Sequence, residues 1–134
     1  MSPFQEVEHT ADWALHVWGT TREELFVAAA QGMYALMGVQ LQTPAPVWRE
    51  IQVQAADYEA LLVAWLQELL FSLESAGVAF APLRVIALTP TRLTVVAEGE
   101  APVRVSKLIK AVTYHNLHIQ PRPEGYETTI VFDV

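Results

Sequence analysis

The chain has 134 residues, of which 52% are hydrophobic and 17% charged, and it contains no cysteine. This composition excludes an intrinsically disordered chain, disulfides and thiolate metal sites, and the length fits a single domain, 1–134. The net charge of −7 argues against strong direct binding to nucleic acid, whose backbone requires a basic face. No apolar run reaches transmembrane length and no signal-peptide pattern opens the chain, so we expect no membrane association and a cytoplasmic protein.

The first half of the chain predicts two strands, a helix, a strand and a second helix. The first four of these elements are expected over residues 4–8, 13–18, 22–37 and 48–55. Thr21 and Glu24 have the spacing of a capping box, which starts the first helix. Asp57 caps the second helix, in which leucines recur at i, i+3, i+4 spacing until Gly77 ends it.

The second half changes to the two-residue period of strands. Strands are expected over residues 85–88, 93–98, 109–119 and 126–132. The first two form a hairpin, and residues 122–125 form a turn before the last strand. Because each helix has one apolar face, the predicted fold is an α+β two-layer sandwich: a mixed, largely antiparallel sheet of about six strands with two helices on one face.

Carboxylates occur at two notable places in the sequence. Asp12 ends the polar segment 9–12, directly before the first apolar strand, and Asp133 adjoins the α-carboxylate of Val134. If the last strand brings these groups together, they form a site for a hard cation such as Ca²⁺ or Mg²⁺. Alternatively, Asp12 is a turn residue and Asp133 belongs to a solvated tail, and spacing alone favours this interpretation.

The remaining polar residues form no recognised catalytic motif. None of the four histidines forms the i, i+4 pair typical of zinc hydrolases, and the chain lacks a phosphate-binding glycine loop and a nucleophile elbow. His115 and His118 are three positions apart in a predicted strand, so they should point to opposite faces. His9 is a candidate to orient a ligand or transfer a proton. Lys110 is either a solvated strand-end residue or a cation that contacts a partner.

Three stretches together resemble the archease family. The segment HTAD over 9–12, with the following strand and the helix opening at 23–26, is similar to that family's N-terminus. The segment IKAVTYH over 109–115 is similar to its most recognisable segment, and VFDV over 131–134 to its C-terminal Val-Phe-Asp-Ile. The resemblance spans the whole chain.

The resemblance implies a protein that is not itself an enzyme. Archease-like proteins activate an RtcB-type RNA ligase in tRNA splicing and RNA repair, by promoting ligase guanylylation and multiple turnover. The resemblance also implies a divalent metal, commonly calcium, held by Asp12, Asp133 and the terminal carboxylate of Val134. Lys110 matches the functionally important lysine, and Lys110 and Asp12 would act on the partner. We then expect His9 to orient the metal ligands rather than to catalyse.

Two positions depart from the family pattern. Trp13 stands where a smaller aliphatic residue is expected, and Leu108 stands where many members have Glu. A missing carboxylate at position 108 predicts weaker metal binding. Two other hypotheses stay open: a chaperone-like interaction module, and a small metal-dependent phosphohydrolase that uses Asp12, His9 and Asp133. The hydrolase ranks last because it has few ligands and no evident general base.

Overall fold

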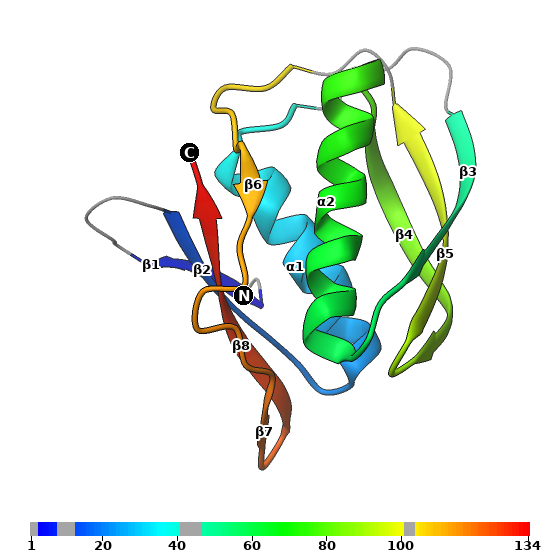
Figure 1. The fold of residues 1–134 in the computed structure, drawn as a ribbon. Coiled ribbons are helices and arrows are strands. Elements are labelled where there is room, and N and C mark those ends of the chain that lie inside the picture. The colour runs from blue at the N-terminus through cyan, green and yellow to red at the C-terminus, as the bar shows by residue number, and fades with distance from the viewer. Residues whose placement is uncertain (1–2, 8–12, 41–46, 101–103) are drawn as a thin grey trace.

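The structure is a computed structural model that describes residues 3–7, 13–40, 47–100 and 104–134 (Figure 1). Its elements, in chain order, are β1 (Phe4–Val7), β2 (Trp13–Gly19), α1 (Arg22–Leu36), β3 (Val47–Gln54), α2 (Tyr58–Ala76), β4 (Ala79–Thr89), β5 (Arg92–Glu100), β6 (Ala111–Val112), β7 (Gln120–Arg122) and β8 (Gly125–Asp133).

The strands form two antiparallel sheets with both helices between them (Figure 1). One sheet has the order β1-β2-β8-β6, with β7 also paired to β8, and the other has the order β3-β5-β4. The predicted α+β sandwich with two helices is therefore confirmed. The division of the strands differs from the prediction, because two sheets replace the single sheet and the helices are not confined to one outer face.

Small residues on α1 explain how this helix packs on two sides. Ala28, Ala29, Ala30 and Gly32 are all buried, and the helix packs against β2 of one sheet and β4 of the other. A Cβ atom at Gly32 would lie 2.6 Å from the Cδ2 atom of Leu15, so glycine permits the close approach of β2. These small residues form a second buried face that a search for a leucine stripe does not detect.

The predicted helix ends are confirmed. The Thr21 hydroxyl accepts a hydrogen bond from the Glu24 N–H at 3.1 Å, and the Asp57 carboxylate accepts one from the Ala60 N–H at 2.8 Å. Gly77 ends α2 in the left-handed conformation, with φ of 65°. The capping box differs in one respect, because the Glu24 carboxylate bonds the backbone and hydroxyl of Thr20 rather than the Thr21 N–H.

Two buried polar contacts tie the core together. The Trp65 indole N–H of α2 donates to the Phe26 carbonyl of α1 at 3.0 Å. The Tyr34 hydroxyl of α1 accepts a hydrogen bond from the Phe80 N–H of β4 at 3.2 Å. Burial raises the pKa of Tyr34 well above its ordinary value, although the Phe80 N–H acts in the opposite direction. Tyr34 is therefore a neutral buried phenol that links a helix to the β3-β5-β4 sheet.

The prediction of one long strand over 109–119 is wrong. Strand β6 contains only Ala111 and Val112, and the chain then turns, with the Leu117 N–H donating to the Tyr114 carbonyl at 3.0 Å. Asn116 adopts a φ of 51°, which asparagine tolerates better than most residues. The histidines at 115 and 118 consequently lie in a loop, and the argument that they point to opposite faces of a strand fails.

Candidate functional site

Strand β8 ends between the strand that follows segment 9–12 and the segment that contains Lys110. Trp13, which directly follows the segment 9–12, pairs with Phe132 from one side of β8. Ala111 pairs with Asp133 from the other side, and the Lys110 N–H donates to the Asp133 carbonyl at 2.8 Å. Strand β8 thus brings the beginning of β2 and the beginning of β6 to one edge of the molecule.

Two of the predicted metal ligands lie among the described residues. Asp133 and Val134 are both exposed at the end of β8, where Asp133 offers a side-chain carboxylate. Such oxygen donors suit a hard cation like Ca²⁺. Asp12 and His9 lie outside the described residues. Within the described part of the chain, no group of three or more His, Asp or Glu side chains is arranged to hold a metal ion.

Lys110 links this edge to the outer flank of α2. Its backbone bonds Asp133, whereas its exposed side chain lines a groove together with Glu68, Phe71 and Glu74 of α2. None of the ion pairs found among the described residues includes Lys110. Within the described part of the chain, the exposed Lys110 ammonium group is thus not held by an ion pair.

A second lysine at this edge was missed by the sequence analysis. The Lys107 ammonium lies 5.1 Å from the centre of the Trp13 ring, a distance that permits a cation–π interaction. The Lys107 N–H also donates to the Met37 carbonyl at 3.0 Å, which holds this segment against the end of α1. The unusual Trp13 thus has a local partner. Leu108, the other departure from the family pattern, is 72% exposed.

Two of the described histidines, His16 and His118, belong to a separate polar cluster. His16 Nε2 lies 3.8 Å from the Glu127 carboxylate, and Arg122 approaches the same carboxylate to 3.2 Å. His118 Nδ1 lies 3.9 Å from Glu59. The cluster surrounds a cavity of about 140 Å³ that His16, His118 and Glu127 share. None of these three side chains is among the predicted site residues.

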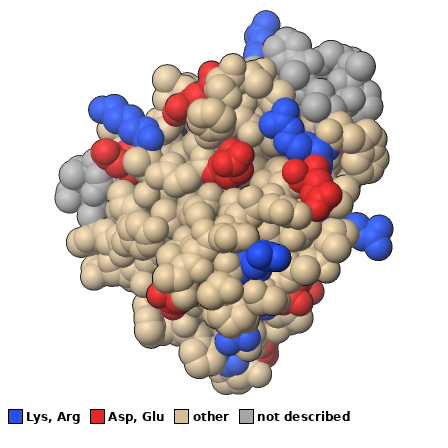
Figure 2. Space-filling model, turned by 45° about the vertical axis from the view of Figure 1, so that its right-hand side comes forward, with Lys and Arg blue, Asp and Glu red and all other residues tan. Residues whose placement is uncertain are grey.

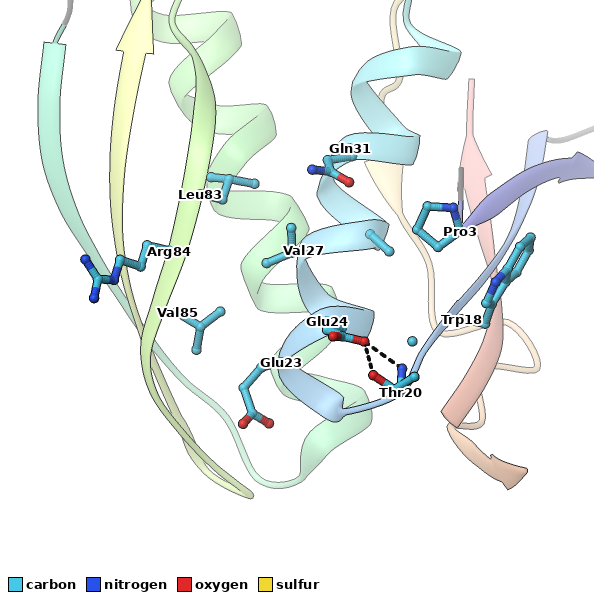
Figure 3. A pocket seen from close by; sticks show the side chains of 12 residues that line it. Pro3, Trp18, Thr20, Glu23, Glu24, Val27, Gln31, Leu83, Arg84 and Val85 are labelled. Carbon is cyan, nitrogen blue, oxygen red and sulfur yellow. Dashed lines mark hydrogen bonds between the residues drawn. The ribbon is translucent and has the colours of Figure 1, made fainter. Parts of the chain in front are cut away.

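Each helix leaves one flank in an open groove. The α1 groove, of about 600 Å³, lies between α1 and the edge strand β4. In Figure 3, Leu83 and Val85 point across this groove toward Val27, whereas Arg84 points away from it. The α2 groove, of about 540 Å³, lies between α2, the end of β3 and Lys110. Only the α2 groove includes a predicted site residue among the residues that line it.

The charged residues are dispersed over the face in Figure 2. Lys and Arg side chains are scattered among acidic and uncharged ones and do not gather into a basic strip. A phosphate backbone would find no continuous cationic track on this face. Among the described residues, neither helix combines the length and apolarity needed to cross a membrane.

Two helices between a five-stranded and a three-stranded antiparallel sheet define a small α+β sandwich protein whose candidate site lies at the end of its last strand. The model of the archease protein family matches residues 4–134, and the chain belongs to this family. The protein archease of Methanosarcina barkeri is 32% identical, with 98% of this chain and 95% of that protein aligned. The protein archease of Thermococcus gammatolerans is 35% identical, with 93% of each aligned.

Solved structures share the fold. The solution structure of protein 1598 from Methanobacterium thermoautotrophicum has a TM-score of 0.74 at 26% identity, over the full length of both chains. The crystal structure of an archease from Thermotoga maritima, described as a possible chaperone, has a TM-score of 0.70 at 24% identity, over 97% of this chain and 96% of that one. At that identity, the second similarity supports the fold alone.

Proposed function

We propose that this protein activates an RtcB-type RNA ligase by promoting formation of the ligase–guanylate intermediate, and that it catalyses no reaction itself. The observation that carries the proposal is the convergence at the end of β8. The three stretches on which the family resemblance rests lie far apart in the sequence, yet Trp13, Lys110 and Asp133 are joined there by strand pairing and a backbone hydrogen bond. This pairing brings two predicted site residues, Lys110 and Asp133, to one edge of the molecule.

The proposed mechanism assigns different roles to the groups at this edge. The carboxylates of Asp133, Val134 and Asp12 would hold a divalent cation, with calcium favoured by an all-oxygen donor set. When bound, that cation supplies positive charge that can orient phosphate oxygens. Lys110 would present a separate cation to the nucleotide or to a partner carboxylate. These groups act by positioning and electrostatics, since the described edge contains no nucleophile–base pair.

A chaperone-like interaction module is the second candidate. It is supported by large apolar side chains that are more than half exposed: Trp48, Phe71, Ile86, Leu108 and Tyr114. Such a protein would suppress aggregation of unrelated clients, and replacement of Asp12 would not matter. Ligase activation by contrast requires the carboxylates of one edge.

A guanylylation assay tests the proposal. An RtcB-type ligase from the same cell, incubated with labelled GTP, should form more covalent guanylate over repeated turnovers when the wild-type protein is added. Asp12→Ala should lose this effect, and Glu124→Ala, an exposed acidic control in the turn before β8, should keep it. Full stimulation by Asp12→Ala would contradict the proposed role of the metal-binding edge, and no stimulation by wild type would contradict the function itself.

A further inference from the structure

The α2 groove has the composition of a docking surface rather than of a sealed packing defect. Phe71 lines it and is 64% exposed, although α2 buries nearly all its other large apolar side chains. Val53 of β3 and Leu70 of α2 add apolar lining. An aromatic side chain in an open groove is an anchor point that a partner's apolar side chain can cover.

Acidic side chains give the groove a preference for a basic partner. Glu68 and Glu74 line it, and neither forms an ion pair with another described residue. Glu74 also lies in the last turn of α2, which contains no basic residue. A carboxylate there faces the negative end of the helix dipole, which is unfavourable until a cation approaches. A partner's Lys or Arg would therefore gain attraction and relieve this repulsion.

The groove is continuous with the candidate site through Lys110. Its side chain lines the groove, and its backbone N–H donates to the Asp133 carbonyl at 2.8 Å. A segment seated on α2 would consequently hold the partner against the end of β8. The α1 groove offers no such connection, because none of its lining residues is a predicted site residue.

We propose that the α2 groove binds a basic, amphipathic segment of the ligase partner, with an apolar side chain over Phe71 and cations beside Glu68 and Glu74. This inference rests on the proposed function, because it takes the ligase as the partner. The groove supplies affinity, and the residues at the end of β8 supply activation. Docking and activation are thus separable by substitution.

The test measures binding and activation separately with the full-length protein and the ligase. The double variant Phe71→Ser, Glu74→Lys should raise the dissociation constant by about tenfold or more. This is the effect expected when an anchor that the partner buries is lost and a charge is reversed. The matched control is Ile86→Ser, Glu124→Lys, which changes an apolar residue that is also more than half exposed and an acid away from the groove, and it should bind like wild type. Added salt should weaken the binding of wild type to the ligase more than it weakens the binding of the groove variant.

The two proposals fail in distinguishable ways. At saturating concentration the groove variant should still stimulate guanylylation, whereas Asp12→Ala, which changes no residue that lines the groove, should bind without stimulating. If wild type stimulates the ligase and the groove variant binds as tightly as wild type, the groove is not the docking surface. If wild type binds through the groove and never stimulates, the docking surface stands and the proposed function falls. Thermal unfolding curves that match wild type confirm that each variant is folded.

Discussion

Trp13 and Phe132 are cross-strand partners, although residues 14–131 lie between them in the chain. Their pairing places the residue that follows Asp12 beside the residue that precedes Asp133. Val112 pairs with the same Phe132 from the other side of β8. A buried aromatic residue at 0% exposure thus anchors the edge on which the proposed metal ligands and Lys110 depend.

Calcium binding should depend on the Asp133 side chain. Asp133→Asn removes one anionic oxygen donor and is expected to weaken calcium affinity by about tenfold, because affinity at such sites follows the number of charged ligands. Titration calorimetry measures the change. The fold should be unaffected, since Asp133 is exposed and pairs with Ala111 through the backbone.

The terminal carboxylate has its own test. Residues appended after Val134 of the 134-residue chain convert this carboxylate into a peptide group and should also weaken calcium affinity. Glu124→Gln, an exposed acid in the turn before β8, serves as the control for net charge. Unchanged affinity in the extended chain would remove Val134 from the ligand set.

Activation should depend on the charge of Lys110. Lys110→Ala is expected to abolish stimulation of the ligase while leaving unfolding unchanged, because the side chain is exposed and its structural hydrogen bond comes from the backbone. Lys110→Arg, which keeps a positive charge, should retain part of the effect. Arg92→Ala in the β4–β5 hairpin is the control. Guanylylation rates are the readout, and a fully active Lys110→Ala would exclude a role for this charge.

Local chemistry made the helices predictable. Thr21, Asp57 and Gly77 each act within one turn of their own position, so capping residues reveal helix ends without knowledge of the fold. The β4–β5 hairpin and the turn before β8 were predictable for the same reason, since each turn joins neighbouring strands.

Long-range pairing was not predictable in the same way. Alternation shows that β3 and β8 are strands, but it does not say which strands pair, so the division into two sheets was missed. Asn116 was the overlooked sign that the stretch 109–119 turns. The Lys107 contact with Trp13 depends on tertiary packing and has no sequence periodicity. The resemblance selected Asp133 and Lys110, and the structure shows that their backbones meet.

The buried Tyr34 hydroxyl should contribute to stability. Tyr34→Phe leaves the Phe80 N–H without its partner in a buried place and is expected to cost about 1–3 kcal/mol of the free energy of unfolding. Urea unfolding measures this loss. Tyr114→Phe is the control, because Tyr114 is 61% exposed and its replacement should change stability by less than about 0.5 kcal/mol.

The same phenol predicts a stability change at high pH. Burial raises the pKa of Tyr34 above the ordinary value of 10.0, so the unfolded chain loses this proton before the folded one does. The folded state binds more protons above pH 10, and its stability should fall there as pH rises. Tyr34→Phe should remove this part of the decline. An identical decline in the variant would show that the other tyrosines account for all of it.

The turn before α1 contains a carboxylate whose contribution to stability should change with pH in the opposite direction, at low pH. The Thr20 hydroxyl, followed by the Thr20 backbone N–H, donates to the Glu24 carboxylate and lowers its pKa below the ordinary value of 4.5. A lowered pKa means that the ionised form is favoured by folding, so its contribution is present above pH 4.5 and disappears as pH falls through the folded pKa. Thr20→Ala removes the hydroxyl and should raise the pKa of Glu24, while the backbone N–H keeps part of the effect.

Carboxyl chemical shifts followed by NMR between neutral and acidic pH test this directly. The stability difference between wild type and Thr20→Ala should shrink over the same range, and a Glu24 pKa that does not move in the variant would show that the hydroxyl contact is not formed in solution.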